Sequence, residues 1–300
     1  MSIEIKNLYK YYGEQAAVKN VSFSIPKGQV VGFLGPNGAG KSTTMKIITG
    51  FIPASEGSVE VCGMPVDTNN LKTRQKIGYL PESNPLYTDM YVREYLEFVA
   101  RIYKIQNIKQ RVDEMISLVG LEIEQHKKIE MLSKGYKQRV GLAQAIIHDP
   151  EVLILDEPTS GLDPNQLVEI RELIKNIGKQ KTVLLSTHIM QEVEAICQRV
   201  LIIKRGELVA DNVASEIKYS DAKQTVFVEF NQNISKSQLQ KVKGVQSVEK
   251  FEKGWLVESS DQIDIRLNIS EFAQSNGVFI LTMKLESKSL EEYFKDLTRN

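Results

Sequence analysis

The nine residues GPNGAGKST, at positions 35–43, have the composition and spacing of a phosphate-binding loop. Fixed positions of the pattern G-x-x-x-x-G-K-[ST] are occupied by Gly35, Gly40, Lys41 and Ser42. Glycines let backbone N–H groups approach phosphate oxygens, and a helix that starts near Lys41 adds unpaired N–H groups and the positive end of its dipole. The lysine reaches toward the β- and γ-phosphates, and the hydroxyl of Ser42 is a ligand type that Mg²⁺ prefers. We expect the phosphates to bind Gly35, Pro36, Asn37, Gly38, Ala39, Gly40, Lys41, Ser42 and Thr43.

An acidic pair follows the apolar run VLIL further along the chain. A buried strand that ends at Asp156 fits the part of a phosphate-loop site where an aspartate holds the Mg²⁺ shell. The next residue, Glu157, is suited to orient or deprotonate a water that attacks the γ-phosphate. His188 directly follows the next predicted strand, so we expect it at the same edge of the sheet, in contact with the γ-phosphate. The loop alone does not separate ATPases, GTPases and kinases.

Apolar spacing predicts the elements that must position these residues. Short strands and turns are expected over residues 1–32, and the apolar strand KGQVVGFLG enters the phosphate loop. A helix is expected over residues 41–49, with Gly50 as its C-terminal cap and GSVEVCG as a hairpin strand after it. In residues 91–148 apolar residues recur every three or four positions, which predicts a helix-rich region. The helices expected there are VREYLEFVARIYKI, QRVDEMISLVG and RVGLAQAIIH.

Two short apolar strands, EVLILDEP and TVLLSTH, flank the helical pattern PNQLVEIRELIKNIG. This order predicts a βαβ crossover in a mixed or parallel sheet, and RVLIIKRGELVA is expected to close the domain as a hairpin. After a boundary near residues 212–223 the pattern reads strand, helix, strand, strand, helix, strand, followed by a final helix SLEEYFKDLT. The βαββαβ order is typical of a small ferredoxin-like domain. Trp255 and Phe251 are expected in its core.

Composition limits the class of protein. The chain has 300 residues, 42% of them hydrophobic, and a formal net charge of zero, which gives no general attraction to nucleic acid or anionic lipid. It has only two cysteines, Cys62 and Cys197, which are far apart in sequence. This argues against a disulfide framework and favours an intracellular location. No apolar run approaches the roughly 18–20 residues needed to cross a bilayer, so any membrane-spanning part is expected on other chains.

In its motifs and their order, the chain resembles ATP-binding-cassette (ABC) ATPases over about residues 1–215. GPNGAGKST resembles their Walker A motif, LILDE their Walker B, SGLD their D-loop with Asp163, and STH their switch histidine. The resemblance puts Tyr12 where the family has an aromatic that stacks on adenine, and neighbouring Tyr11 is the alternative. LSKGYKQR stands at the place of the signature LSGGQ; there Ser133 and Gly135 are retained, and the family uses them to contact the γ-phosphate.

Two segments depart from the family pattern. Glu82 stands where the family usually has glutamine; its oxygen can serve Mg²⁺, but it adds negative charge near three phosphates. In the signature, Lys134 replaces the first glycine of the pair and Tyr136 replaces glutamine. Lys134 either adds charge beside that phosphate or points to solvent. The metal ligands expected from motif and resemblance together are Ser42, Glu82 and Asp156, and the catalytic residues are Lys41, Glu157 and His188.

The resemblance implies an α/β P-loop fold: a mixed-sheet ATPase domain over 1–215 with a helical subdomain at about 84–150, a linker at 216–223 and an α+β domain over 224–300. It implies ATP and Mg²⁺ as ligands, and a homodimer or a pair with a related ATPase subunit. Permease subunits on separate chains are the expected membrane partners, contacted through residues about 84–97. The expected location is cytoplasmic, peripheral on the inner face of the cell membrane.

The sequences of the motifs, together with the extra C-terminal domain, are most similar to those of ATPases of the ABC-2 export type. Among those it most resembles the ATP-binding subunits associated with gliding motility. Two other classes are alternatives: a soluble ABC machine of translation or DNA repair, and a regulatory module that binds nucleotide without turnover. One cassette, no long heptad run and no basic tail argue against the first. The complete set Asp156, Glu157 and His188 argues against the second. The C-terminal domain is expected to make a dimer contact or a regulatory surface.

Overall fold

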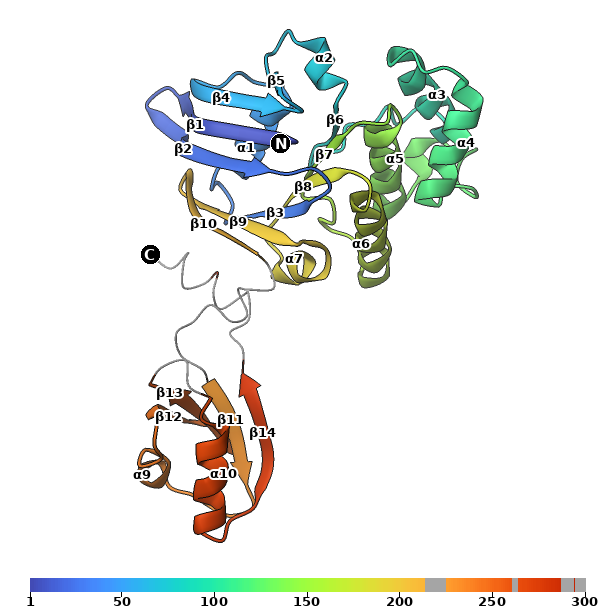
Figure 1. Ribbon diagram of the computed structural model, residues 1–300. Helices are drawn as coiled ribbons and strands as arrows, with labels where there is room; N and C mark the ends of the chain where they lie inside the picture. The colour runs from blue at the N-terminus through green and yellow to red at the C-terminus, as the bar shows by residue number, and fades with distance from the viewer. Residues whose placement is uncertain (214–224, 261–263, 287–293, 295–300) are drawn as a thin grey trace. The chain divides into compact units, whose positions relative to one another are not determined.

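The computed structural model describes residues 1–213, 225–260, 264–286 and 294 (Figure 1). Contacts within the chain divide it into two compact units, and the division falls between residues 214 and 215. The linker expected at 216–223 and the final helix expected at 289–298 lie outside the described residues, apart from residue 294.

A mixed sheet of six strands forms the centre of the first unit, in the order β10-β9-β3-β8-β7-β6. Its strands are β10 (Glu207–Val213), β9 (Arg199–Lys204), β3 (Val30–Leu34), β8 (Thr182–Thr187), β7 (Val152–Asp156) and β6 (Ile77–Leu80). The edge strand β10 is antiparallel to β9, whereas the other neighbouring pairs are parallel. Strands β3, β7 and β8 are buried along their whole length, which explains why their sequences do not alternate.

The parallel pairing brings the predicted functional segments to one edge of the sheet. The carboxyl ends of β3, β6, β7 and β8 lead into the phosphate loop, Glu82, Glu157 and His188 respectively. Helix α6 (Pro164–Gly178) connects the parallel neighbours β7 and β8, so the predicted βαβ crossover is confirmed. Clefts at this edge of parallel sheets are the usual place for ligands.

A second, antiparallel sheet lies beside α1 (Lys41–Ile48), in the order β2-β1-β4-β5. Its strands are β2 (Gln15–Ile25), β1 (Ile3–Tyr12), β4 (Glu56–Val61) and β5 (Met64–Pro65). The prediction of short strands before residue 32 was wrong, because β1 and β2 have 10 and 11 residues. Register shifts interrupt their pairing, so the apolar alternation breaks where the strand itself continues. Phe23, Phe33, Met45 and Ile48 belong to the core shared by the two sheets and α1.

Three helices pack together into the predicted helix-rich region at the far side of the unit from this second sheet (Figure 1). They are α3 (Val92–Ile102), α4 (Ile108–Val119) and α5 (Lys134–Ile146). Helix α5 also contacts β6 and thereby joins the helical region to the central sheet. Shorter elements are α2 (Leu71–Arg74), the 3₁₀ turn η1 (Ile129–Met131) and α7 (Met190–Ile196).

The second unit has the predicted βαββαβ order. Its elements are β11 (Thr225–Phe230), α9 (Lys236–Leu239), β12 (Val245–Phe251), β13 (Gly254–Ser259), α10 (Arg266–Ser275) and β14 (Ile280–Glu286). The sheet order β12-β13-β11-β14 is antiparallel throughout, which confirms the ferredoxin-like prediction. One face of the sheet packs Val226, Val228 and Val257 against Ile269 of α10.

The two aromatics predicted for this core have different environments. Trp255 packs against the buried cluster, and the Lys250 ammonium lies 4.6 Å from the centre of its ring. The prediction for Phe251 was wrong, because its side chain is 48% exposed. Lys250 pairs with Trp255 in the sheet, so the next residue, Phe251, points to the opposite face, where its ring meets the edge of Phe227.

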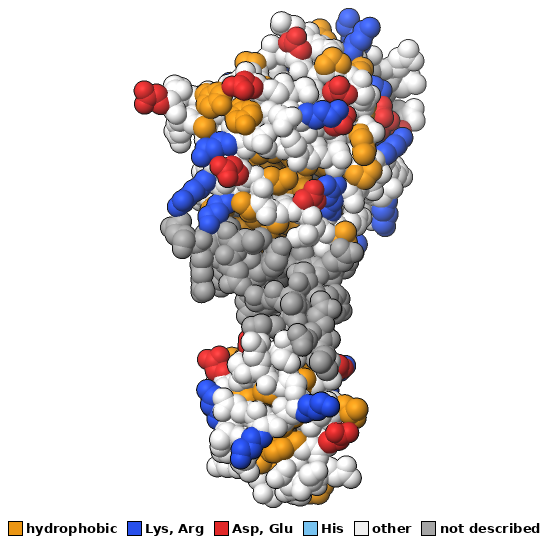
Figure 2. All heavy atoms as spheres, turned by 60° about the vertical axis from the view of Figure 1, so that its left-hand side comes forward, with side chains coloured by type: hydrophobic (Ala, Val, Ile, Leu, Met, Phe, Trp, Pro, Cys, Tyr) orange, Lys and Arg blue, Asp and Glu red, His pale blue; other side chains and the backbone are white. Residues whose placement is uncertain are grey.

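The surface mixes charges of both signs. In Figure 2 the Lys and Arg side chains are interspersed with Asp and Glu on the visible face, with hydrophobic side chains between them. Among the described residues, the structure contains no helix with the length and apolar character needed to cross a bilayer.

Candidate functional site

A cavity of about 900 Å³ opens over the start of α1, at the carboxyl edge of the central sheet. Its size suits a small-molecule ligand such as a nucleotide. The residues that line it are Glu14, Gln15, Ala16, Ala17, Lys19, Asn37, Gly38, Ala39, Gly40, Lys41, Ser42, Thr43, Glu82, Glu157, Ser160, His188 and Arg205. Residues 37–43 of the phosphate loop, Glu82 and the residues after β7 and β8 are therefore together in one cavity, although they come from four segments of the chain; the predicted Gly35 and Pro36 do not line it.

The glycines of the phosphate loop are required by its geometry. Gly40 has φ +106°, which is the left-handed region, and a Cβ there would lie 2.5 Å from the carbonyl oxygen of Ala17. A Cβ on Gly35 would overlap the carbonyl oxygen of Ile203. Helix α1 starts after Gly40 without a side-chain cap, so its first N–H groups are left for a ligand.

Lys41 is held inside this loop. Its ammonium donates to the carbonyl oxygens of Gly35 at 2.7 Å and Pro36 at 3.3 Å, and the residue is only 6% exposed. Burial lowers the pKa of the Lys41 ammonium, and the nearby carboxylates of Glu157, Asp156 and Glu82 act in the opposite direction. The buried ammonium attracts phosphate oxygens, and it offsets part of the repulsion that the three nearby carboxylates would exert on the phosphates of a nucleotide.

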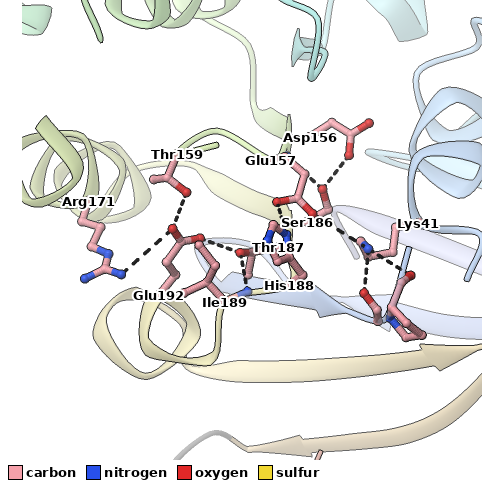
Figure 3. Close-up of polar contacts among 12 residues, drawn as sticks. Lys41, Asp156, Glu157, Thr159, Arg171, Ser186, Thr187, His188, Ile189 and Glu192 are labelled. Carbon is pink, nitrogen blue, oxygen red and sulfur yellow. Dashed lines mark hydrogen bonds and ion pairs between the residues drawn. The ribbon is translucent and has the colours of Figure 1, made fainter. Parts of the chain in front are cut away.

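Glu157 lies between Lys41 and His188 (Figure 3). Its Oε1 is 3.9 Å from the ammonium of Lys41, and its Oε2 is 2.9 Å from Nδ1 of His188. The carboxylate is buried, whereas the histidine side chain is half exposed to the cavity. A carboxylate in this position is oriented by two partners and can accept a proton from a water in the cavity.

The backbone at Glu157 is unusual for a residue other than glycine, because its φ is +50°. The N–H of Glu157 donates to the hydroxyl of Ser186 at 2.9 Å, and that hydroxyl donates to Asp156 at 2.5 Å. Ser186 on β8 thus fixes both members of the acidic pair at the end of β7. The strained turn re-aims Glu157 toward the cavity, whereas Asp156 is 2% exposed and does not line the cavity.

The protein itself offers only a few ligands for a Mg²⁺ ion. The described residues contain no group of three His, Cys, Asp or Glu side chains that would hold a metal by themselves. Ser42 and Glu82 line the same cavity, and the buried Asp156 carboxylate is close enough to Lys41 to affect its pKa. One or two carboxylates, a hydroxyl and the phosphates of a substrate are a typical Mg²⁺ set. The residues therefore fit the ion when a nucleotide is bound.

Several predicted residues lie outside this cavity. Tyr12 does not line it; its ring is 51% exposed and faces the ammonium of Lys10 at 5.4 Å. Tyr11 is instead stacked on Tyr9, with ring centroids 6.0 Å apart. Asp163 caps α6 by accepting from the N–H groups of residues 165 and 166.

The segment Ser133–Tyr136 also lies away from the cavity, at the start of α5. Ser133 caps this helix, its hydroxyl accepting from the N–H of Tyr136 at 3.4 Å. Gly135 is packed so closely that a Cβ would lie 2.5 Å from the side chain of Gln166 on α6. The ammonium of Lys134 lies against Gly161 of the SGLD turn. Lys134 therefore contacts a turn of its own chain.

A groove of about 670 Å³ borders residues 81–85. The groove is lined by Pro81, Ser83 and Pro85, whereas Glu82 between them lines the cavity. Arg74, Tyr79 and His148 also line it, and each has a buried polar side-chain atom without a hydrogen-bond partner. Such atoms are rare in folded proteins and are usually satisfied by a bound group or water.

Some residues of the cavity were not predicted. Ser160 lies three residues after Glu157, and its position after the acidic pair was a usable signal. Residues 14–19 follow Tyr12 but match no phosphate motif, and Arg205 lies in the β9–β10 turn. The role of Ser186 was signalled by its place two residues before His188 at the end of a buried strand.

Known proteins are similar to this chain in sequence and in fold. The family model of the ABC transporter matches residues 18–160. Bacitracin transport ATP-binding protein BcrA of Bacillus licheniformis is 33% identical, over 98% of this chain and 96% of that protein. Nod factor export ATP-binding protein I of Burkholderia orbicola is 37% identical, over 70% of this chain and 70% of that protein. The dimeric structure of the ATP-binding cassette MJ0796 with ADP and Pi aligns with a TM-score of 0.65 and 28% identity, covering 71% of this chain and 98% of that one.

Proposed function

This chain belongs to the ABC transporter family, and from that premise we propose that it powers export through separate membrane subunits. It is an ATP-binding subunit that hydrolyses ATP to ADP and phosphate. The similar proteins are transporter subunits, which does not favour a soluble machine of translation or DNA repair. The observation that supports its own turnover is the position of Glu157 between Lys41 and His188 on the wall of the cavity.

In the proposed mechanism the phosphates of ATP lie on the N–H groups of the loop before α1, with Lys41 beside the γ-phosphate. The buried carboxylate of Glu157 orients the attacking water and accepts its proton as the new P–O bond forms. The bond between the γ-phosphorus and the bridging oxygen breaks, and ADP leaves with that electron pair. His188 donates to the γ-phosphate and, through Nδ1, keeps Glu157 in place.

Mg²⁺ would be held by Ser42 and Glu82 together with phosphate oxygens, with Asp156 in the shell behind them. The ion would neutralise charge on the phosphates, which matters here because Glu82 adds a carboxylate to the cavity. ATP turnover that persists in excess chelator would contradict this assignment.

The permease subunits are proposed to dock where residues 81–97 leave the central sheet. This stretch borders the groove and contains the exposed aromatics Tyr87 and Tyr91. Amphipathic aromatics of this kind are typical of interface centres. Docking would place the protein on the inner face of the cell membrane without a spanning helix of its own.

Two finer proposals rest on similarity of the motifs. The first is that the transporter is of the ABC-2 export type; the name of the Nod factor relative supports export, and the type rests on the motifs. The second is a role in gliding motility; unchanged colony spreading after deletion of the gene would contradict it.

We also propose that residues 224–300 form an accessory domain that follows a linker at 216–223. If removal of that domain leaves both ATP-dependent dimerisation and turnover unchanged, it has neither a dimer nor a regulatory role.

The direct test compares wild-type protein with Glu157→Gln. The variant keeps the shape of the side chain but loses the base, so we expect kcat to fall by at least about 100-fold while ATP binding is retained. Phosphate release and nucleotide binding measure the two effects, and Glu172→Gln on the exposed face of α6 is the control.

The transport role is tested by capture of the tagged chain from detergent-solubilised membranes of the source cells. Recovery without any integral membrane subunit would contradict it.

A further inference from the structure

Glu192 is a buried carboxylate behind the site, outside the lining of the cavity (Figure 3). It comes from the first turn of α7, and the residue is 1% exposed. Each of its oxygens accepts a hydrogen bond from a buried threonine: Oε1 from Thr159, and Oε2 from Thr187 at 2.6 Å. Hydrogen bonds to a buried charged group are strong, and a buried carboxylate is retained only where it has such partners.

The two threonines belong to the two segments that contain the proposed catalytic residues. Thr159 lies two residues after Glu157, in the turn that leaves β7. Thr187 immediately precedes His188, and its hydroxyl also accepts from the N–H of Ile189 at 3.0 Å. The backbone on both sides of His188 is thus tied to one hydroxyl, and that hydroxyl is tied to Glu192.

The charge of Glu192 has a cationic neighbour from a third element. Nη2 of Arg171 on α6 lies 4.0 Å from Oε1, and its side chain is largely buried. Glu192 therefore connects α6, α7 and the segments after β7 and β8 at one point. Replacing it by an amide would keep the volume, but would remove the charge and give one threonine hydroxyl a donor where it now has an acceptor.

We propose that Glu192 is a positioning residue for ATP hydrolysis, because it sets the distance between Glu157 and His188 through Thr159 and Thr187. The inference rests on the roles proposed above for these two residues. Their Oε2–Nδ1 contact of 2.9 Å joins the segments after β7 and β8, which Ser186 also connects through the N–H of Glu157, and small errors in such geometry are costly for turnover.

The test is Glu192→Gln in the full-length chain, with Glu194→Gln on the exposed face of the same helix as the control. Glu192→Gln is expected to lower kcat by about 10-fold or more while the KM for ATP stays within about twofold, since Glu192 does not line the cavity. The control keeps both parameters. A purely structural role would instead lower the temperature of unfolding and leave kcat of the folded protein unchanged, and that result would overturn the inference.

A second pair of variants does not depend on how Glu192→Gln folds. Thr187→Val removes the hydroxyl and is expected to reduce kcat in the same way, whereas Thr187→Ser keeps the hydroxyl and restores it. Equal kcat in the two variants would overturn the inference. Glu157→Gln measured in parallel separates the causes: if it turns over normally, the site assignment is wrong, but if it is inactive while Glu192→Gln is normal, only the positioning role is wrong.

Discussion

The first turns of α1 and α5 offer the same local feature and have opposite surroundings. Both helices start next to small residues, Gly40 in one case and Ser133 with Gly135 in the other. The start of α1 has no side-chain cap and lies in a cavity with Lys41, Glu157 and His188. The start of α5 is capped by exposed Ser133 and lies outside that cavity. From this comparison we infer that the first is a phosphate site formed by residues of one chain, and we propose that the second contacts a ligand held by another chain.

A second copy of the chain is our proposal for what brings it. Head-to-tail pairing would put the start of α5 of one copy over the ATP held at α1 of the other, and it gives both copies the same contact. The dimeric cassette structure with ADP and Pi supports such a pair by similarity. The predictions that follow either break this contrast between the two helix starts or sharpen it.

The largest effect is expected at α1. Lys41→Ala removes a buried ammonium from the phosphate loop, and we expect ATP turnover to fall by at least about 100-fold, together with weaker nucleotide binding. Lys109→Ala on the exposed face of α4 is a matched control. Turnover is measured by phosphate release, and nucleotide binding by calorimetry. Near-normal turnover in Lys41→Ala would mean that the phosphates of ATP do not bind at the start of α1.

A mixture of two variants tests whether the α5 site acts in trans. Lys41→Ala and Ser133→Ala each disable both composite sites of their own homodimer, but a mixed dimer keeps one intact site. Random pairing in an equal mixture should give about a quarter of the wild-type rate, well above either parent. Phosphate release is compared before and after the proteins are mixed. A mixture no better than its parents contradicts a shared site.

The smallest effect is expected at Lys134. Its ammonium lies against Gly161 of its own chain, so Lys134→Ala should change the affinity of the ATP-dependent dimer by less than about threefold, as for other exposed charges. Sedimentation of the Glu157→Gln background with ATP measures this affinity. A loss of more than tenfold would show instead that Lys134 contacts the phosphate bound by the other copy.

Local patterns predicted much of this molecule because they depend on neighbours in sequence. The bounds of α6 follow from an N-terminal Asp163-Pro164 pair and a regular apolar stripe, and the phosphate loop follows from glycine spacing. Side-chain contacts between distant segments leave no such pattern. In the sequence, Glu192 is only an acidic residue on a short helix, and Arg205 is only a turn residue. The place of Arg205 beside the phosphate loop follows from the sheet order, in which β9 lies next to β3.

Lys134 shows the same limit from the other direction. Sequence left two readings for it, toward a phosphate or toward solvent, and neither included the turn at Gly161 of the same chain. That contact exists because α5 and α6 begin side by side, as the packing of Gly135 against Gln166 shows. Phe251 was misplaced for a related reason: in a sheet the face of a residue depends on register, and one step along β12 changes it.

The segment of residues 81–85 borders two spaces, since Pro81, Ser83 and Pro85 line the groove and Glu82 lines the cavity. Any molecule that shifts this segment from one side changes the free energy of binding on the other. Thermodynamic linkage makes that effect reciprocal: a membrane partner that tightens ATP binding tenfold must itself be bound ten times more tightly when ATP is present, which corresponds to about 1.4 kcal/mol. The strength of coupling between transport and hydrolysis can therefore be measured without the membrane subunits. The measured quantity is the change in the ATP affinity of this chain when a peptide binds in the groove.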